Sequence, residues 1–293
     1  MAGHRYGGYW THQKLSVLEK YLNAYTQALK KQAFELIYID GFAGTGERTI
    51  DQSAADLFGE DGVEVSIDGS ARIALKTDQP FDQHYFIESR SDRIQALNKL
   101  KELNADREID VLEGDANILI KNICRDTAWR PNEGAPGRGR RAVLFLDPYG
   151  LDVEWDTLVE ISKTKAIDVW YLFSIEGLYR QAAHDFGKVD EAKAACLDRI
   201  LGTTEWRKTF YSPSSQNDLF IQPDDPRRAV NIDGLQRFVT DRLSKLFPYV
   251  APPLPLPKSG GPQRFSLYFF ISNPDGSAIG LSRRIAGDIL LHI

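Results

Sequence analysis

The apolar residues of this chain follow two alternating patterns. In residues 10–31 they recur at spacings of three and four, which predicts an amphipathic helix. Short unbroken apolar runs follow, each typical of a strand buried on both faces. We expect these strands at Glu35–Ile39, His84–Ile87, Ile109–Leu112, Ala142–Leu146 and Ile167–Phe173. Because helical patterns separate the runs, the sequence predicts a doubly wound α/β sheet that is mostly parallel.

The remaining segments predict additions to this sheet rather than a second domain. Two insertions interrupt the alternation, a polar one at residues 47–69 and a helical one at about 176–248. The C-terminal part predicts a closing strand at Arg264–Ile271 and a closing helix at Ser282–Leu291. We therefore expect residues 1–293 to form a single domain with an N-terminal helix and an antiparallel C-terminal sheet edge.

Composition and charge exclude several classes of protein. The net charge of −5 argues against indiscriminate nucleic-acid binding, although a local basic patch remains compatible with it. The two cysteines, Cys124 and Cys196, lie far apart and match no zinc-ligand spacing, so we expect no metal site and no disulfide framework. No segment approaches the roughly 18 apolar residues of a membrane span. These features predict a cytoplasmic protein that does not enter a membrane.

A glycine-rich turn, residues 40–46 (DGFAGTG), directly follows the first predicted strand. Glycines permit positive φ and let the backbone approach a ligand closely, and the ligand would bind beyond the carboxyl end of the strand. The turn lacks the third glycine of the dinucleotide fingerprint, where Thr49 stands, and the Gly-Lys-Ser/Thr of a phosphate-binding loop. We therefore predict a ligand that needs no phosphate contact. The alternative is a tight turn that binds nothing.

The acid at the start of this turn narrows the choice of ligand. The carboxylate of Asp40 would repel a pyrophosphate and attract an ammonium group. S-adenosylmethionine carries such an ammonium group beside its sulfonium, so it is the cofactor that we expect. In this interpretation the residues that shape the cofactor turn are Gly41, Phe42, Gly44 and Gly46.

Two further acids follow the next strands. Glu88 ends the second strand, where a carboxylate can accept hydrogen bonds from both ribose hydroxyls of a nucleoside. Asp115 follows the third strand and could bind an adenine amino group, with Ala116 offering the neighbouring backbone amide. The alternatives are a solvated strand-end acid for Glu88 and an N-cap for Asp115.

The fourth strand ends in Asp147-Pro148-Tyr149-Gly150, which suggests a reaction site. Enzymes that methylate an exocyclic amine place an acid or amide, then proline, then an aromatic residue after this strand. The carboxylate of Asp147 and a backbone carbonyl near Pro148 would hold the amine, and the ring of Tyr149 would stack on a flipped base. The alternative is a β-turn nucleated by Asp-Pro.

Several segments together resemble known protein families. The turn DGFAGTG resembles motif I of class I S-adenosylmethionine-dependent methyltransferases, with Glu88 and Asp115 where those enzymes carry their ribose and adenine acids. More narrowly, the chain resembles the three-Cys-motif partner proteins (TcmP). The matching segments are Trp10-Thr11-x-x-Lys14-Leu15, Tyr38–Gly46, Asp68–Arg72 and Phe145–Gly150.

This resemblance implies a methyltransferase-like Rossmann fold and a separate partner protein. The partner would carry a three-cysteine motif and look like a radical S-adenosylmethionine enzyme. The chain departs from the Asp-Pro-Pro-Tyr of established adenine N6-methyltransferases, because it has one proline before Tyr149.

Three functions are therefore open from the sequence. The first is a methyltransferase that acts on an exocyclic amine of a DNA or RNA base. The second is a non-catalytic or accessory partner of the three-cysteine-motif protein. The third, an NAD-linked oxidoreductase, is disfavoured by the missing third glycine.

Overall fold

A computed structural model describes residues 9–51, 64–130, 138–212, 226–257 and 261–292. Its central sheet has the strand order β10-β12-β7-β6-β1-β4-β5, with β11 paired to β12. The pairs β5–β4–β1–β6–β7 are all parallel, and β12 is antiparallel to β7. The strands of this sheet are β1 (Phe34–Asp40), β4 (Gln83–Glu88), β5 (Ile109–Glu113), β6 (Gly139–Leu146), β7 (Ile167–Phe173), β10 (Tyr249–Val250), β11 (Leu254–Leu256) and β12 (Phe265–Ile271).

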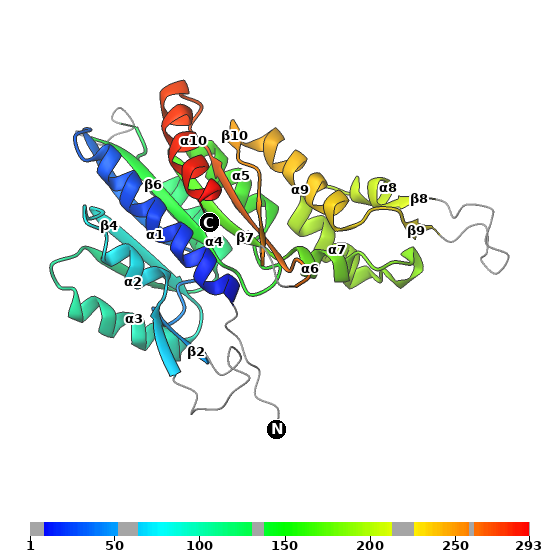
Figure 1. The fold of residues 1–293 in the computed structure, drawn as a ribbon, viewed down its shortest axis with the longest axis horizontal. Coiled ribbons are helices and arrows are strands. Elements are labelled where there is room, and N and C mark those ends of the chain that lie inside the picture. Colours follow the sequence, from blue (N-terminus) through cyan, green and yellow to red (C-terminus); the bar gives the residue numbers. More distant parts are fainter. Residues whose placement is uncertain (1–8, 52–63, 131–137, 213–225, 258–260, 293) are drawn as a thin grey trace.

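Helices cover both faces of this sheet (Figure 1). One buried cluster joins the sheet to α1, α2, α3 and α10, and a second joins its other face to α4, α5, α7 and α9. The helices are α1 (Tyr9–Leu29), α2 (Ser70–Leu75), α3 (Ser91–Leu103), α4 (Ala116–Asp126), α5 (Trp155–Thr164), α6 (Ile175–Gln181), α7 (Glu191–Leu201), α8 (Trp206–Phe210), α9 (Ile232–Leu246) and α10 (Gly276–Leu291). The topology confirms the predicted fold class, a doubly wound, mostly parallel sheet with an antiparallel C-terminal edge.

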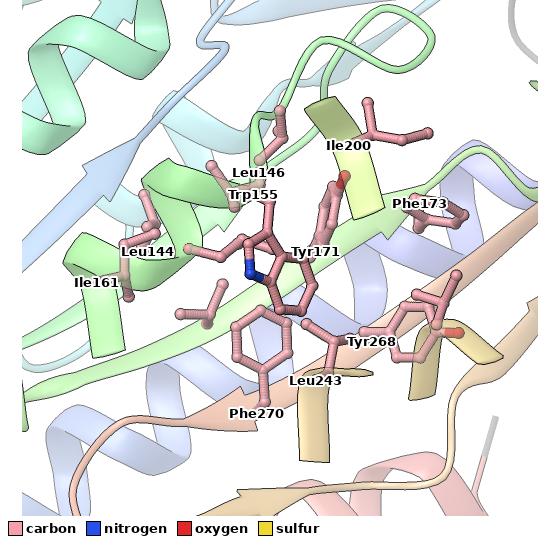
Figure 2. Close-up of a cluster of buried hydrophobic side chains, with 14 of the residues drawn as sticks. Leu144, Leu146, Trp155, Ile161, Tyr171, Phe173, Ile200, Leu243, Tyr268 and Phe270 are labelled. Carbon is pink, nitrogen blue, oxygen red and sulfur yellow. The ribbon is translucent and has the colours of Figure 1, made fainter. Parts of the chain in front are cut away.

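The inserted helices pack on the sheet through large apolar side chains. Figure 2 shows Trp155 of α5 among residues of β6, β7 and β12, with Ile200 of α7 and Leu243 of α9 closing over them. Strand β7 is buried along its whole length, which explains its unbroken apolar sequence. This packing anchors α6, which begins directly after β7, at the carboxyl end of the parallel strands.

The residues between β1 and α2 contain a two-stranded ribbon, of which the sequence predicts only a short strand at Val63-Glu64-Val65. Strands β2 (Glu47–Asp51) and β3 (Glu64–Asp68) pair as an antiparallel ribbon separate from the main sheet. Gly69 at its end donates its N–H to the carbonyl of Gly46 at 2.9 Å, which closes the ribbon against the glycine turn. In β3 the apolar residues Val65 and Ile67 alternate with polar ones, as expected of a strand, whereas β2 has a single apolar residue, Ile50, and so gives no such signal.

Two predicted boundaries need correction. The strand predicted at Ala142–Leu146 begins earlier, at Gly139, so Arg140 and Arg141 belong to β6. Arg140 forms an ion pair with Glu35 of β1 at 2.8 Å. Helix α10 begins at Gly276 rather than Ser282, since Asp275 caps its first turn.

The helical insertion contains three more short elements. They are the paired strands β8 (Tyr211–Ser212) and β9 (Arg227–Arg228) and the short helix η2 (Phe186–Lys188).

Candidate functional site

The glycine turn after β1 is held between the two neighbouring strands. Gly41 donates its N–H to the carbonyl of Phe145 at 2.9 Å, and Ala43 donates to Ile87 at 3.0 Å. A Cβ atom at Gly41 would lie 2.9 Å from Leu146 Cδ2 and closer than 3.4 Å to Ile120. A Cβ atom here would therefore require the ends of the Leu146 and Ile120 side chains to shift. Glycine at this position favours close packing rather than an unusual φ.

Two later glycines give the turn its shape. Gly44 has φ of +65° and Gly46 has φ of +74°, a region that favours glycine. No heavy atom lies within 4 Å of the place where a Cβ of Gly44 would be. The backbone at Gly44 is therefore bare and open, as a turn that contacts a ligand requires.

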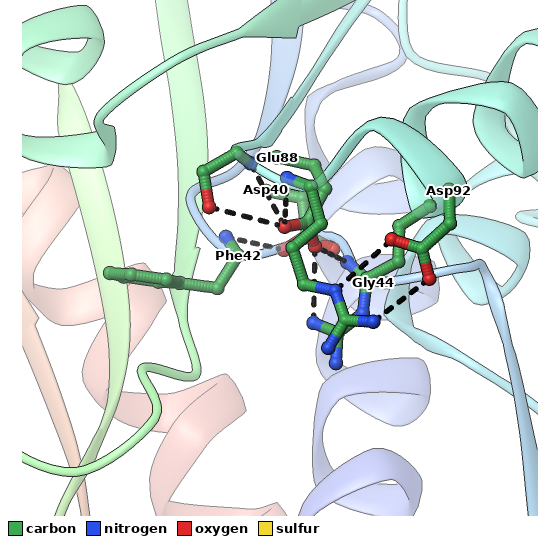
Figure 3. Close-up of polar contacts among 8 residues, drawn as sticks. Asp40, Phe42, Gly44, Glu88 and Asp92 are labelled. Carbon is green, nitrogen blue, oxygen red and sulfur yellow. Dashed lines mark hydrogen bonds and ion pairs between the residues drawn. The ribbon is translucent and has the colours of Figure 1, made fainter.

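Glu88, at the end of β4, is bound to this turn (Figure 3). Its Oε2 accepts a hydrogen bond from the N–H of Gly44 at 3.1 Å and an ion-pair contact from Arg93 at 3.3 Å. Its Oε1 accepts from the N–H groups of Ser89 at 2.9 Å and Arg90 at 3.0 Å. The carboxylate is 7% exposed and points toward the glycine turn rather than into solvent. The side chain of Arg93 is 40% exposed and is its one partner on a long flexible side chain in the described residues.

Asp40 is fully buried at the start of the turn. Its Oδ1 accepts from the N–H of Phe42 at 3.2 Å, and its Oδ2 accepts from the hydroxyl of Tyr38 at 3.3 Å. Burial, with a smaller contribution from the charge of Asp147, raises the pKa of Asp40 to about 6, against the hydrogen bonds from Ser70 and Phe42. The structure thus brings the two predicted acids of β1 and β6 together.

Lys14 of α1 supplies the positive charge between these strands. Its Nζ donates to Oδ1 of Asp147 at 2.8 Å and to Oδ2 at 2.7 Å, and the two side chains are 4% and 6% exposed. Charge-assisted hydrogen bonds to both oxygens of one carboxylate are strong and directional. Lys14 belongs to the segment Trp10-Thr11-x-x-Lys14-Leu15 singled out above. Its pairing with Asp147 could not be predicted, since 133 residues separate the two.

The residues after Asp147 form an exposed turn. Pro148 is buried, Tyr149 is 78% exposed, and Gly150 adopts φ of +87°. The side chain of Tyr149 therefore lies at the carboxyl edge of β6, mostly exposed to solvent rather than packed into the core.

Asp115 and Ala116 lie at the start of α4. Asp115 is exposed, and its Oδ1 accepts from the N–H of Ile118 at 3.0 Å, so it is the N-cap of the helix. A carboxylate has a second oxygen, so capping is compatible with the predicted adenine contact. Ala116 is buried, as is Asn117, which joins this helix start to α5 through Glu154 N and Thr157 Oγ1. Nothing local in the sequence indicates that the Asn117 side chain links α4 to α5.

The described residues carry neither a metal cluster nor a spanning helix. Among them no group of three or more His, Cys, Asp or Glu side chains could hold a metal ion. No helix among them is long and apolar enough to cross a membrane.

No protein-family model matches the chain, and no curated protein matches it. Solved structures with some similarity include protein LPL1258 from Legionella pneumophila str. Philadelphia 1, at 12% identity over 94% of this chain and 91% of that one, with a TM-score of 0.46. Spermidine synthase from Thermotoga maritima is 11% identical over 90% and 60%, with a TM-score of 0.40. TYW2 from M. jannaschii in complex with AdoMet is 11% identical over 76% and 78%, with a TM-score of 0.29.

These TM-scores are low, so the fold assignment depends on the strand order itself. By that order the chain is a Rossmann-like α/β protein with the antiparallel C-terminal edge expected of the methyltransferase-like class. The acids that the sequence singled out, Asp40, Glu88 and Asp147, lie at its carboxyl edge, at the ends of three adjacent parallel strands.

Proposed function

We propose that this chain is a class I S-adenosylmethionine-dependent methyltransferase that acts on an exocyclic amine of a nucleic-acid base. The observation that carries the proposal is the convergence of a bare glycine turn with Asp40 and Glu88 at one sheet edge. Ligands of open α/β sheets bind in this place.

The residues present fit the cofactor. Open space at Gly44 leaves room for the ligand at the turn, and no residue of the turn is a phosphate-binding lysine. Asp40 would pair with the ammonium group of the amino-acid moiety, Glu88 would accept from the ribose hydroxyls, and Asp115 with Ala116 would bind the adenine. When bound, the cofactor supplies an electrophilic methyl group on its sulfonium.

The residues of β6 would then hold the acceptor. Tyr149 offers an exposed ring for stacking, and Asp147 offers a carboxylate, held by Lys14, that can accept hydrogen bonds from an amine. Orienting an amine toward an electrophile is a positional effect, so much of the rate enhancement would come from this alignment.

The pKa of Asp40 predicts how cofactor binding depends on pH. The carboxylate is ionised above its pKa of about 6 and pairs with an ammonium group only in that form. We expect the affinity for S-adenosylmethionine, measured by isothermal titration calorimetry, to fall about tenfold between pH 7.5 and pH 5. In the Asp40→Asn variant the affinity should be weaker and nearly independent of pH. A wild-type affinity that stays flat across this range would remove Asp40 from the site.

Transfer of a labelled methyl group tests the acceptor half of the proposal. Single-stranded DNA and RNA are incubated with the protein and radiolabelled S-adenosylmethionine. Tyr149→Ala should lower the labelling rate by about tenfold or more, because stacking on a base contributes about 1–3 kcal/mol. Tyr149→Phe keeps the ring and should retain most of the rate. Both variants are expected to fold, since the side chain is 78% exposed. Equal labelling by Tyr149→Ala and wild type would contradict the assignment.

The ion pair at Asp147 favours a second candidate function, an accessory partner of a three-cysteine-motif protein. Both oxygens of Asp147 already contact the buried Lys14, as in an ion pair that serves only to stabilise the fold. Such a partner would bind S-adenosylmethionine or keep only the fold, and would label neither DNA nor RNA. Its interaction with a three-cysteine-motif protein is tested by co-purification from cells that express both.

A further inference from the structure

A concave site lies beside α6, outside the residues discussed so far. A cavity of about 230 Å³ opens where α6, the start of α9 and the segment before β12 meet. Drug-sized sites measure about 300–1,000 Å³, so this one has room for a single planar ring system. Its lining residues are Glu176, Tyr179, Ile232, Pro262, Gln263 and Arg264.

Tyr179 presents an aromatic surface to this cavity and is 40% exposed. The guanidinium of Arg228 lies 3.6 Å from the centroid of its ring. Arg228 is 8% exposed and is held in place by hydrogen bonds to the carbonyls of Tyr179 at 2.8 Å and Ala182 at 2.6 Å. The buried guanidinium of Arg228, which does not line the cavity, therefore packs against one face of the Tyr179 ring and holds the ring in place.

This arrangement selects the kind of ring that stacks on Tyr179. A cation over one face of an aromatic ring attracts its π electrons, so the ring attracts a second cation less strongly. An electron-rich neutral ring in offset stacking is then the favoured neighbour. Nucleobases have this character, whereas quaternary ammonium groups do not.

The rim of the cavity carries both signs of charge. Arg264 Nε donates to Glu176 Oε2 at 2.8 Å, and the two side chains are 45% and 36% exposed. The other N–H groups of the guanidinium can donate to a phosphate or to a base edge, and the second carboxylate oxygen can accept from an exocyclic amine. The guanidinium carbon of Arg264 also lies 5.4 Å from the centroid of the Trp10 ring. Trp10 precedes Lys14 by about one turn of α1. The cavity is therefore connected to the edge that carries Asp147.

We infer that this cavity binds one unpaired base of a single-stranded nucleic acid, with Tyr179 as the stacking platform. The inference rests on the proposed function for the identity of the acceptor and adds a second base-binding position beside Tyr149. Single strands are recognised in this way, by aromatic side chains that stack on bases splayed from the chain. The chain as a whole is acidic, so a local contact rather than a broad basic surface must supply the affinity.

Binding of fluorescein-labelled single-stranded oligonucleotides, measured by anisotropy without any cofactor, tests the inference. DNA and RNA form two arms of the experiment. We expect Tyr179→Ala to weaken binding in at least one arm by about tenfold, because stacking contributes about 1–3 kcal/mol per base. Tyr179→Phe keeps the ring and should bind within about twofold of wild type. Leu103→Ala removes an exposed apolar side chain on α3, outside the residues that line the cavity, and is the control.

The outcomes separate this inference from the proposed function. Stacking releases no counterions, so the ratio of wild-type to Tyr179→Ala affinity should stay constant as salt rises while both affinities fall. Equal binding by wild type and Tyr179→Ala overturns the inference, as does a wild type that binds neither oligonucleotide. S-adenosylmethionine binding by calorimetry is unaffected by Tyr179→Ala on our assignment. Intact cofactor binding together with equal oligonucleotide binding by wild type and Tyr179→Ala would thus refute the base subsite alone.

Discussion

We expect Lys14→Met to lower the free energy of unfolding by about 3–5 kcal/mol at neutral pH, because it leaves a buried carboxylate without its counter-ion. Asp147 is 6% exposed and contacts Lys14 through both oxygens. Methionine retains the apolar stem length of lysine, so little packing is lost and the missing charge accounts for the effect. Urea unfolding followed by circular dichroism measures the change.

A double variant separates the charge from the position. Lys14→Met with Asp147→Leu replaces the pair by apolar side chains, and we expect it to recover most of the stability lost in the single variant, since buried pairs exchanged as a unit are often close to neutral. Asp147→Leu alone removes the carboxylate that Lys14 contacts and should be destabilised like Lys14→Met. If Lys14→Met lowered the free energy of unfolding by less than about 1 kcal/mol, the Lys14–Asp147 contact would contribute no more than a surface ion pair.

Much of the site could be predicted because it follows from chain-local rules. Apolar runs located the strands, and in parallel sheets all such strands end at one edge. That rule alone brings Asp40, Glu88 and Asp147 together, although 48 and 59 residues separate them in the sequence printed above. The glycines of the turn were recognisable because positive φ restricts the residues that can occupy those positions.

What could not be predicted depends on contacts between distant segments. Nothing near Lys14 in the sequence indicates that its ammonium group reaches Asp147, because the approach of α1 to β6 is set by the whole apolar face of the helix. Arg93 likewise lies five residues from Glu88, and only the helix turn of α3 directs it back to the carboxylate. The cavity at Tyr179 joins three segments that no local pattern relates.

The partners of Glu88 determine how a ligand could reach it. Three of its contacts come from backbone N–H groups, which keep the carboxylate oriented toward the turn without closing it. Two further contacts come from side chains, the Ser89 hydroxyl at 3.5 Å and Arg93, whose side chain is 40% exposed and can move away into solvent. Ribose hydroxyls would replace the guanidinium as donors to Oε2. Backbone N–H groups thus hold the Glu88 carboxylate in one orientation. The Arg93 side chain must move away before a ligand can contact Oε2.

This arrangement predicts opposite results for two neighbouring variants. Glu88→Gln should weaken S-adenosylmethionine binding by about 100-fold, because hydrogen bonds to a charged acceptor contribute about 1.5–3 kcal/mol each and two ribose hydroxyls lose that acceptor. Arg93→Gln removes the competing cation and should bind the cofactor with equal or higher affinity. Calorimetry measures both, and thermal unfolding shows whether each variant is folded. Wild-type affinity in a folded Glu88→Gln variant would place the ribose elsewhere, whereas a parallel loss in Arg93→Gln would show that the ion pair itself shapes the site.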